Sequence, residues 1–225
     1  MKTPFITCVA AIVRKDLRAE IRSRELLSVM GLFALLSVLL FSFALELDRQ
    51  AREEVVSGVL WVTLIFASLL GLNRSMALER DQGGLDAILA APVSRAAIFV
   101  GKLLGNFVFT GIVGFVLLPL MTALYGMNLL RAPLILTTII GLFGFATVGT
   151  LLATLTVQTR AREALLPIAM LPIVLPFVLT AVRATKAILS GAAANEWQSA
   201  LGMLAAITLI YFLLCLLLYE YVVGE

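Results

Sequence analysis

The stretch best placed to do chemistry is a charged one, residues 79–102, which lies between two long apolar segments. Four of its residues fall at positions i, i+3, i+4 and i+7 of one helical face: Leu85, Ile88, Leu89 and Pro92. Such spacing predicts a short amphipathic helix whose apolar ridge is offered to something outside the bilayer. This helix would bind a partner protein: its apolar ridge would fill a groove of the partner, and the charged residues beside the ridge would lie at the rim of that groove. An alternative is an interfacial loop whose Leu and Ile side chains enter lipid.

The local breaks around this ridge agree with a short helix. Gly83 and Gly84 interrupt the chain before it, and Pro92 limits its extension. Ser94 can then cap a new helix that begins at Arg95, because a serine hydroxyl can accept a hydrogen bond from a free N–H of the first turn.

The sequence carries no recognisable catalytic apparatus. It contains no histidine, no carboxylate pair patterned for acid–base work and no nucleophile–histidine arrangement. The dipeptide Gly101-Lys102 lacks the upstream glycine and the following Ser or Thr of a phosphate-binding loop. Cys8 and Cys215 lie at opposite ends of the chain in unlike settings, which predicts packing residues rather than a disulfide. We therefore expect a non-enzymatic chain whose energy source, if it uses one, belongs to a partner.

Composition sets the class of protein. The 225 residues are 61% hydrophobic and 14% charged, and their mean hydropathy is +1.06. Soluble domains are about 45–50% apolar and about 25% charged, so this composition predicts an all-α integral membrane protein. We expect one domain, residues 1–225, because no polar stretch is long enough to bury a separate core. The formal charge of +3 is spread over loops, which argues against a nucleic-acid partner.

Hydropathy predicts six membrane spans, each long enough at about 1.5 Å per residue to cross a hydrocarbon core of about 30 Å. The third is long, so we expect it to tilt or protrude. The predicted spans are residues 26–45, 55–72, 97–125, 134–157, 164–182 and 200–223.

Residues 1–24 predict an amphipathic helix ahead of the first span. Apolar residues recur every fourth position, at Phe5, Val9, Val13, Leu17 and Ile21. A second stripe is basic and consists of Arg14, Arg18 and Arg22. This pattern favours a helix in the membrane interface with its arginines toward anionic headgroups. The alternative is a juxtamembrane cytosolic helix that packs on a partner.

Charge placement predicts the orientation. Most of the 17 Lys and Arg residues fall in the N-terminal helix and in the connections after the second and fourth spans. By the positive-inside rule these segments and both termini are cytoplasmic. On the outer side, residues 183–199 show a weak helical pattern before a Gly-Ala run, and we expect a short external helical segment there, beside Trp197.

Glycines and prolines mark positions within the spans. Gly101 and Gly105 form a GxxxG pair, and three further glycines lie in the fourth span. Such glycines indicate that helices approach closely at these positions. The alternative is that they reflect only the general abundance of glycine in membrane helices. Three prolines make the fifth span prone to kinks: Pro167, Pro172 and Pro176. Two interpretations remain: a broken helix that lines a substrate path, and a kink that only shapes helix packing. No Lys, Arg, Asp or Glu falls in the middle of a span, which argues against a proton-coupled transporter.

These residues resemble a known family. The chain is similar to the haem exporter protein B family, the membrane permeases of bacterial cytochrome c maturation. The specific pieces are Leu72-Asn73-Arg74-Ser75, Glu79-Arg80, Gly84-Leu85-Asp86, Ala91-Pro92-Val93-Ser94-Arg95 and Gly101-Lys102. A looser likeness extends to other ATP-binding-cassette permeases that export polysaccharides or drugs.

The resemblance implies an assembly in the bacterial inner membrane. Two permease copies would pair with two cytosolic ATPase subunits, which hold ATP and Mg²⁺, and with further maturation subunits and a haem chaperone. Haem would be a possible substrate, and this chain would bind no cofactor. The short helix would be a coupling helix seated in the ATPase. Its residues would be Glu79, Arg80, Leu85, Asp86, Ile88, Leu89, Pro92, Ser94 and Arg95.

Two other functions remain open at this stage. The chain could be the permease of another ATP-driven exporter, for a lipid, glycan or drug. It could also be an assembly module that moves no substrate, in which ATP hydrolysis frees a haem-loaded chaperone from its partners.

Overall fold

The computed structural model describes residues 4–44, 49–81, 93–156 and 162–222. These form seven helices, and no strand occurs among them. The helices are α1 (Phe5–Ser23), α2 (Glu25–Ala44), α3 (Arg49–Asp81), α5 (Arg95–Tyr125), α6 (Ala132–Thr156), α7 (Arg162–Leu189) and α8 (Ala194–Val222). All but α1 are long and apolar enough to cross a membrane. The predicted all-α protein with six spans is therefore confirmed.

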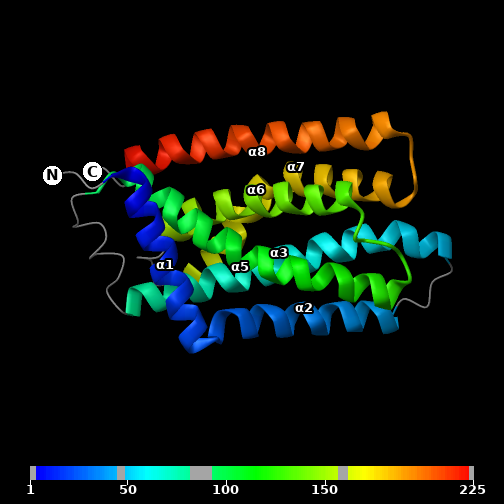
Figure 1. Cartoon of the computed structure of the whole chain (residues 1–225), viewed down its shortest axis with the longest axis horizontal. Coiled ribbons are helices and arrows are strands. Elements are labelled where there is room, and N and C mark those ends of the chain that lie inside the picture. Colours follow the sequence, from blue (N-terminus) through cyan, green and yellow to red (C-terminus); the bar gives the residue numbers. More distant parts are fainter. Residues whose placement is uncertain (1–3, 45–48, 82–92, 157–161, 223–225) are drawn as a thin grey trace.

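The six long helices run side by side, and α1 crosses one end of their bundle (Figure 1). The end of α3, the start of α5 and the end of α8 lie at this same end, which we call the α1 end. An even number of spans accounts for this, because each span reverses the direction of the chain. The connection between α5 and α6 lies at the opposite end.

The sharp turn from α1 into α2 is built by two residues. Arg24 adopts a left-handed conformation with φ of 56°, and its N–H donates to the carbonyl of Glu20. The Glu20 carboxylate, in turn, accepts hydrogen bonds from the N–H groups of Leu26 at 3.3 Å and Leu27 at 2.8 Å. These are N–H groups of the first turn of α2, which has no earlier carbonyl to bond. The carboxylate also suits the positive end of the helix dipole.

The start of α5 follows the prediction. Ser94 is the N-cap, and its hydroxyl accepts a hydrogen bond from the Ala97 N–H at 3.3 Å. The helix then continues for 31 residues to Gly126, which ends it at φ of 66°.

The predicted helical segment between the fifth and sixth spans is helical in its first part, as a continuation of α7. Residues 183–189 are helical, but they are the last turns of α7, which runs without a break to Leu189. No glycine or proline lies between Arg183 and Leu189 to favour a break there. Gly191, with φ of 69°, belongs to the short turn into α8.

Glycines sit where helices meet, as the sequence indicated. A Cβ on Gly101 would lie 2.9 Å from Ile12 of α1, and one on Gly141 would lie 1.9 Å from the ring of Trp61. Trp61 is fully enclosed and donates a hydrogen bond from its indole nitrogen to Thr185 of α7 at 2.9 Å. The glycine of α6 thus makes room for a ring that ties α3 to α7. Of the six spans, α6 is the most extensively buried.

Replacing Gly141 with alanine should therefore destabilise the bundle. The new methyl group would overlap the Trp61 ring, whose position is fixed by packing and by Thr185. Overpacking of this kind costs about 1–3 kcal/mol. Thermal unfolding of the purified protein in detergent should show a lower midpoint for Gly141→Ala. Gly111→Ala in α5 is the matched control, because its Cβ would meet nothing within 4 Å; equal midpoints for the two variants would contradict this account of the α6 packing.

Candidate functional site

The predicted coupling residues divide between described and undescribed parts of the chain. Leu85, Asp86, Ile88, Leu89 and Pro92 lie outside the described residues. The others are placed at the α1 end of the bundle, on the two helices that the connection 82–92 joins. Glu79 and Arg80 are in the last turn of α3, Ser94 caps α5, and Arg95 is its first residue.

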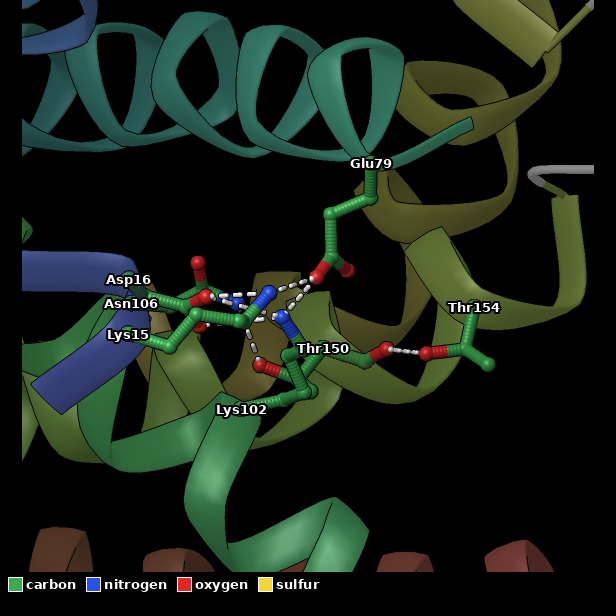
Figure 2. A network of polar contacts seen from close by, with 7 residues as sticks. All are labelled: Lys15, Asp16, Glu79, Lys102, Asn106, Thr150 and Thr154. Carbon is green, nitrogen blue, oxygen red and sulfur yellow. Dashed lines mark hydrogen bonds and ion pairs between the residues drawn. The ribbon is translucent and has the colours of Figure 1, made fainter. Parts of the chain in front are cut away.

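At this end two lysines and two carboxylates form a closed cluster, which we call the ion cluster: Lys15, Asp16, Glu79 and Lys102 (Figure 2). Lys15 Nζ lies 2.9 Å from Asp16 Oδ1 and 2.9 Å from Glu79 Oε1. Lys102 Nζ lies 2.9 Å from Asp16 Oδ2 and also pairs with Glu79 Oε1. Each ammonium thus contacts both carboxylates, and the four formal charges cancel.

Burial makes this cluster different from a surface salt bridge. The side chain of Lys102 is 2% exposed, and those of Glu79 and Asp16 are 8% and 13% exposed. Charges in such surroundings are tolerated only when partners compensate them, because each loses its hydration. Lys15, whose side chain is 48% exposed, forms the outer edge of the cluster. Its partial burial alone would lower its pKa, but the hydrogen bond to Asp16 and the charge of Glu79 outweigh this, so the pKa of Lys15 is raised.

Local sequence explains how α1 comes close enough to join the cluster. Cys8, Ile12, Asp16 and Glu20 recur every fourth residue and form the face of α1 that points into the bundle. The GxxxG pair of α5 lies against this face, and a Cβ on Gly105 would lie only 3.3 Å from Asp16 Oδ2. Small residues at these positions therefore let Asp16 reach Lys102.

A second polar contact continues from the cluster into the bundle. Asn106, one helical turn after Lys102, donates from Nδ2 to the hydroxyl of Thr150 in α6 at 2.9 Å (Figure 2). Thr154 donates to the Thr150 carbonyl at 2.8 Å. Buried polar groups of membrane helices need such partners, because lipid offers none. The cluster and this bond together connect α1, α3, α5 and α6.

The outer surface of α1 carries the predicted basic stripe. Arg14, Arg18 and Arg22 are exposed. The predicted apolar stripe is not the face that points into the bundle: Val9, Val13 and Leu17 are half-buried at its flank, and Phe5 and Ile21 are exposed. The helix therefore has three faces, of which one contacts the bundle, one is basic and one is apolar.

The three prolines of α7 lie within one continuous helix. Pro172 and Pro176 are exposed on its outer side. Pro167 lines an apolar groove of about 230 Å³ between α3 and α7, together with Phe66 and Val174. A path-lining role and a packing role for these prolines both stay predictions.

Sequence reasoning missed the ion cluster. It counted Lys102 among the cytoplasmic cations, gave Asp16 no role and assigned Glu79 to a partner's rim, whereas the structure turns Glu79 inward. The available signal was the four-residue spacing of Asp16 with Ile12 and Cys8, opposite a glycine pair that flanks Lys102. Within the described residues no group of three or more His, Cys, Asp or Glu side chains could hold a metal ion.

The two lysines offer a graded test of the cluster. Lys102→Met should destabilise the protein by about 3–5 kcal/mol, because it leaves buried carboxylate charge uncompensated. Lys15→Met should cost about 1 kcal/mol or less, because solvent screens its half-exposed charge. Thermal unfolding in detergent measures both, and the two substitutions serve as controls for each other. Similar losses in both variants would argue that burial does not set the strength of the cluster.

Comparison with known proteins identifies the family. Heme exporter protein B of Rhodobacter capsulatus is 30% identical over 202 residues, which cover 88% of this chain and 90% of that protein. Heme exporter protein B of Paracoccus denitrificans is 29% identical over 205 residues, with the same coverage. The protein of the same name from Escherichia coli K12 is 28% identical over 102 residues, about half of either chain. The family described as CcmB protein matches residues 7–219, nearly the whole sequence, and the chain therefore belongs to the CcmB family.

Proposed function

We propose that this chain is the membrane permease subunit of an ATP-binding-cassette exporter that moves haem for the biogenesis of c-type cytochromes. The relatives named Heme exporter protein B support the cargo. The observation that carries the proposal is that the end of α3 and the start of α5 lie together at the end that α1 crosses, where the Glu79–Lys102 pair joins the two helices.

A partner subunit supplies the ATPase activity in this proposal. The ridge of Leu85, Ile88 and Leu89 fills an apolar groove of the ATPase, while Asp86 and Arg95 set its register at the rim. ATP and Mg²⁺ bind to that partner, and haem is cargo rather than a resident cofactor. The chain acts as one of two copies, together with other maturation subunits and a haem chaperone.

The proposed location is the bacterial inner membrane, with both termini in the cytoplasm. The chain enters and leaves the bundle at the α1 end, which supports termini on a common side. The excess of Lys and Arg in segments at that end supports the cytoplasmic side. Arg14, Arg18 and Arg22 then face the anionic headgroups of the inner leaflet, and the exposed apolar residues of α1 enter the interface.

Substitutions in the ridge test the docking. Leu89→Asp places a charge in an apolar groove, and Asp86→Arg reverses a rim charge, so each should abolish or strongly reduce co-purification of the ATPase subunit with the tagged permease. Leu130→Asp, in the connection at the opposite end, is the matched control and should leave co-purification intact. Normal ATPase capture by both ridge variants would refute the coupling role.

Transport by the reconstituted complex tests the cargo. Vesicles that hold the wild-type complex should move haem when ATP is hydrolysed, and the same vesicles supplied with a non-hydrolysable ATP analogue should not. Haem accumulation across the membrane, measured by its absorbance after vesicle isolation, gives the result. ATP hydrolysis that releases a haem chaperone without any haem flux would instead favour an assembly module.

A further inference from the structure

The ion cluster joins three elements that are far apart in the sequence. Asp16 and Lys102 are 86 residues apart, and Lys15 and Glu79 are 64 apart. The chain passes through α2 and α3 between the first two, so nothing local brings them together. Figure 2 shows the four side chains converging from α1, α3 and α5 on one point.

The cluster lies at the end of α3 and the start of α5. These two helix ends flank the proposed coupling segment, and we call them its stems. Glu79 is two residues before the end of α3, and Lys102 is about two turns into α5, since an α-helix has 3.6 residues per turn. Their ion pair therefore spans the two helices from which the connection 82–92 extends. Any displacement of that connection acts on both stems, and the pair makes them respond together.

Burial makes the ion pairs of the cluster hard to separate. Separating Lys102 from Glu79 and Asp16 would leave a 2%-exposed ammonium without a counter-charge, and two poorly exposed carboxylates that share the half-exposed Lys15. The attraction between such charges is little screened, because few water molecules reach them. The Arg74–Glu25 pair between α3 and α2 is the contrast: both side chains are nearly half-exposed, so it can open at little cost.

We propose that the ion cluster is the joint through which force on the 82–92 connection reaches the membrane helices: it makes α1, α5 and the end of α3 move as one unit. The inference rests on the proposed function, in which an ATPase pushes on that connection. Lys15, Asp16, Glu79 and Lys102 are positioning residues in this scheme, and none of them contacts ATP or haem. In this scheme α1 moves together with the end of α3 and the start of α5, in addition to binding the membrane interface.

Charge-balanced double variants separate a coupling role from a stabilising one. Glu79→Gln with Lys102→Met removes one charge of each sign and leaves Lys15 paired with Asp16. No net charge is stranded, so folding should survive, but the link between the two stems is gone. Lys15→Met with Asp16→Asn leaves the Glu79–Lys102 pair and removes only the ionic link to α1, whose Ile12 still packs against Gly101.

The experiment compares haem transported per ATP hydrolysed by the complete complex in vesicles. Each double variant should assemble with the ATPase subunit and hydrolyse ATP, while haem moved per ATP falls by about fivefold or more, the range typical of a coupling free energy. Glu25→Gln with Arg74→Gln removes the exposed α2–α3 pair in the same charge-balanced way and should leave this ratio unchanged.

Wild-type haem per ATP in either double variant would overturn the joint, even though docking and export still stand. If only one double variant assembles, its ratio decides. If neither assembles while the control does, the cluster serves folding alone and the inference fails. A wild-type complex that neither docks an ATPase nor exports haem would refute the proposed function itself.

Discussion

The architecture at the α1 end depends on the compensation of buried charge around Lys102. An ammonium this enclosed is stable only with carboxylates in contact, and these come from two other helices. That requirement fixes how α1 lies across the bundle and how the end of α3 meets α5. Hydrophobic attraction selects this arrangement less sharply, because it depends mainly on the apolar area buried and has no preferred direction.

The rest of the bundle is arranged by shape more than by charge. In lipid the helices gain little from hiding apolar surface, so close van der Waals contact must hold them together. The glycines of α5 and α6 supply the hollows, which Ile12 and Trp61 fill. Polar side chains then add direction: the indole N–H of Trp61 reaches Thr185, and Asn106 reaches Thr150. Packing thus brings the helices near, and a few hydrogen bonds and ion pairs select one arrangement.

The sequence predicted the parts of the fold that follow from one-dimensional rules. Six spans follow from hydropathy and length, and the start of α5 follows from the capping chemistry of Ser94. The bundle-facing side of α1 could not be predicted in the same way, because Asp16 counts as a polar residue until a partner is known. The continuation of α7 to Leu189 was missed because the predicted fifth span stops at residue 182, although no glycine or proline favours a break there.

The same limit explains why Lys102 was assigned to the cytoplasm. A sequence does not distinguish a solvated loop lysine from a buried one, and the positive-inside rule counts both in the same way. The proposed orientation does not depend on this distinction, since a lysine near one end of a span still counts toward that side. Its meaning for mechanism changes, however. A solvated Lys102 could be lost without consequence, whereas a buried one obliges Asp16 and Glu79 to stay in place. Under the proposed function, in which motion reaches the permease from a partner outside the bilayer, this buried cluster links α1 to the ends of α3 and α5 more firmly than apolar contact could.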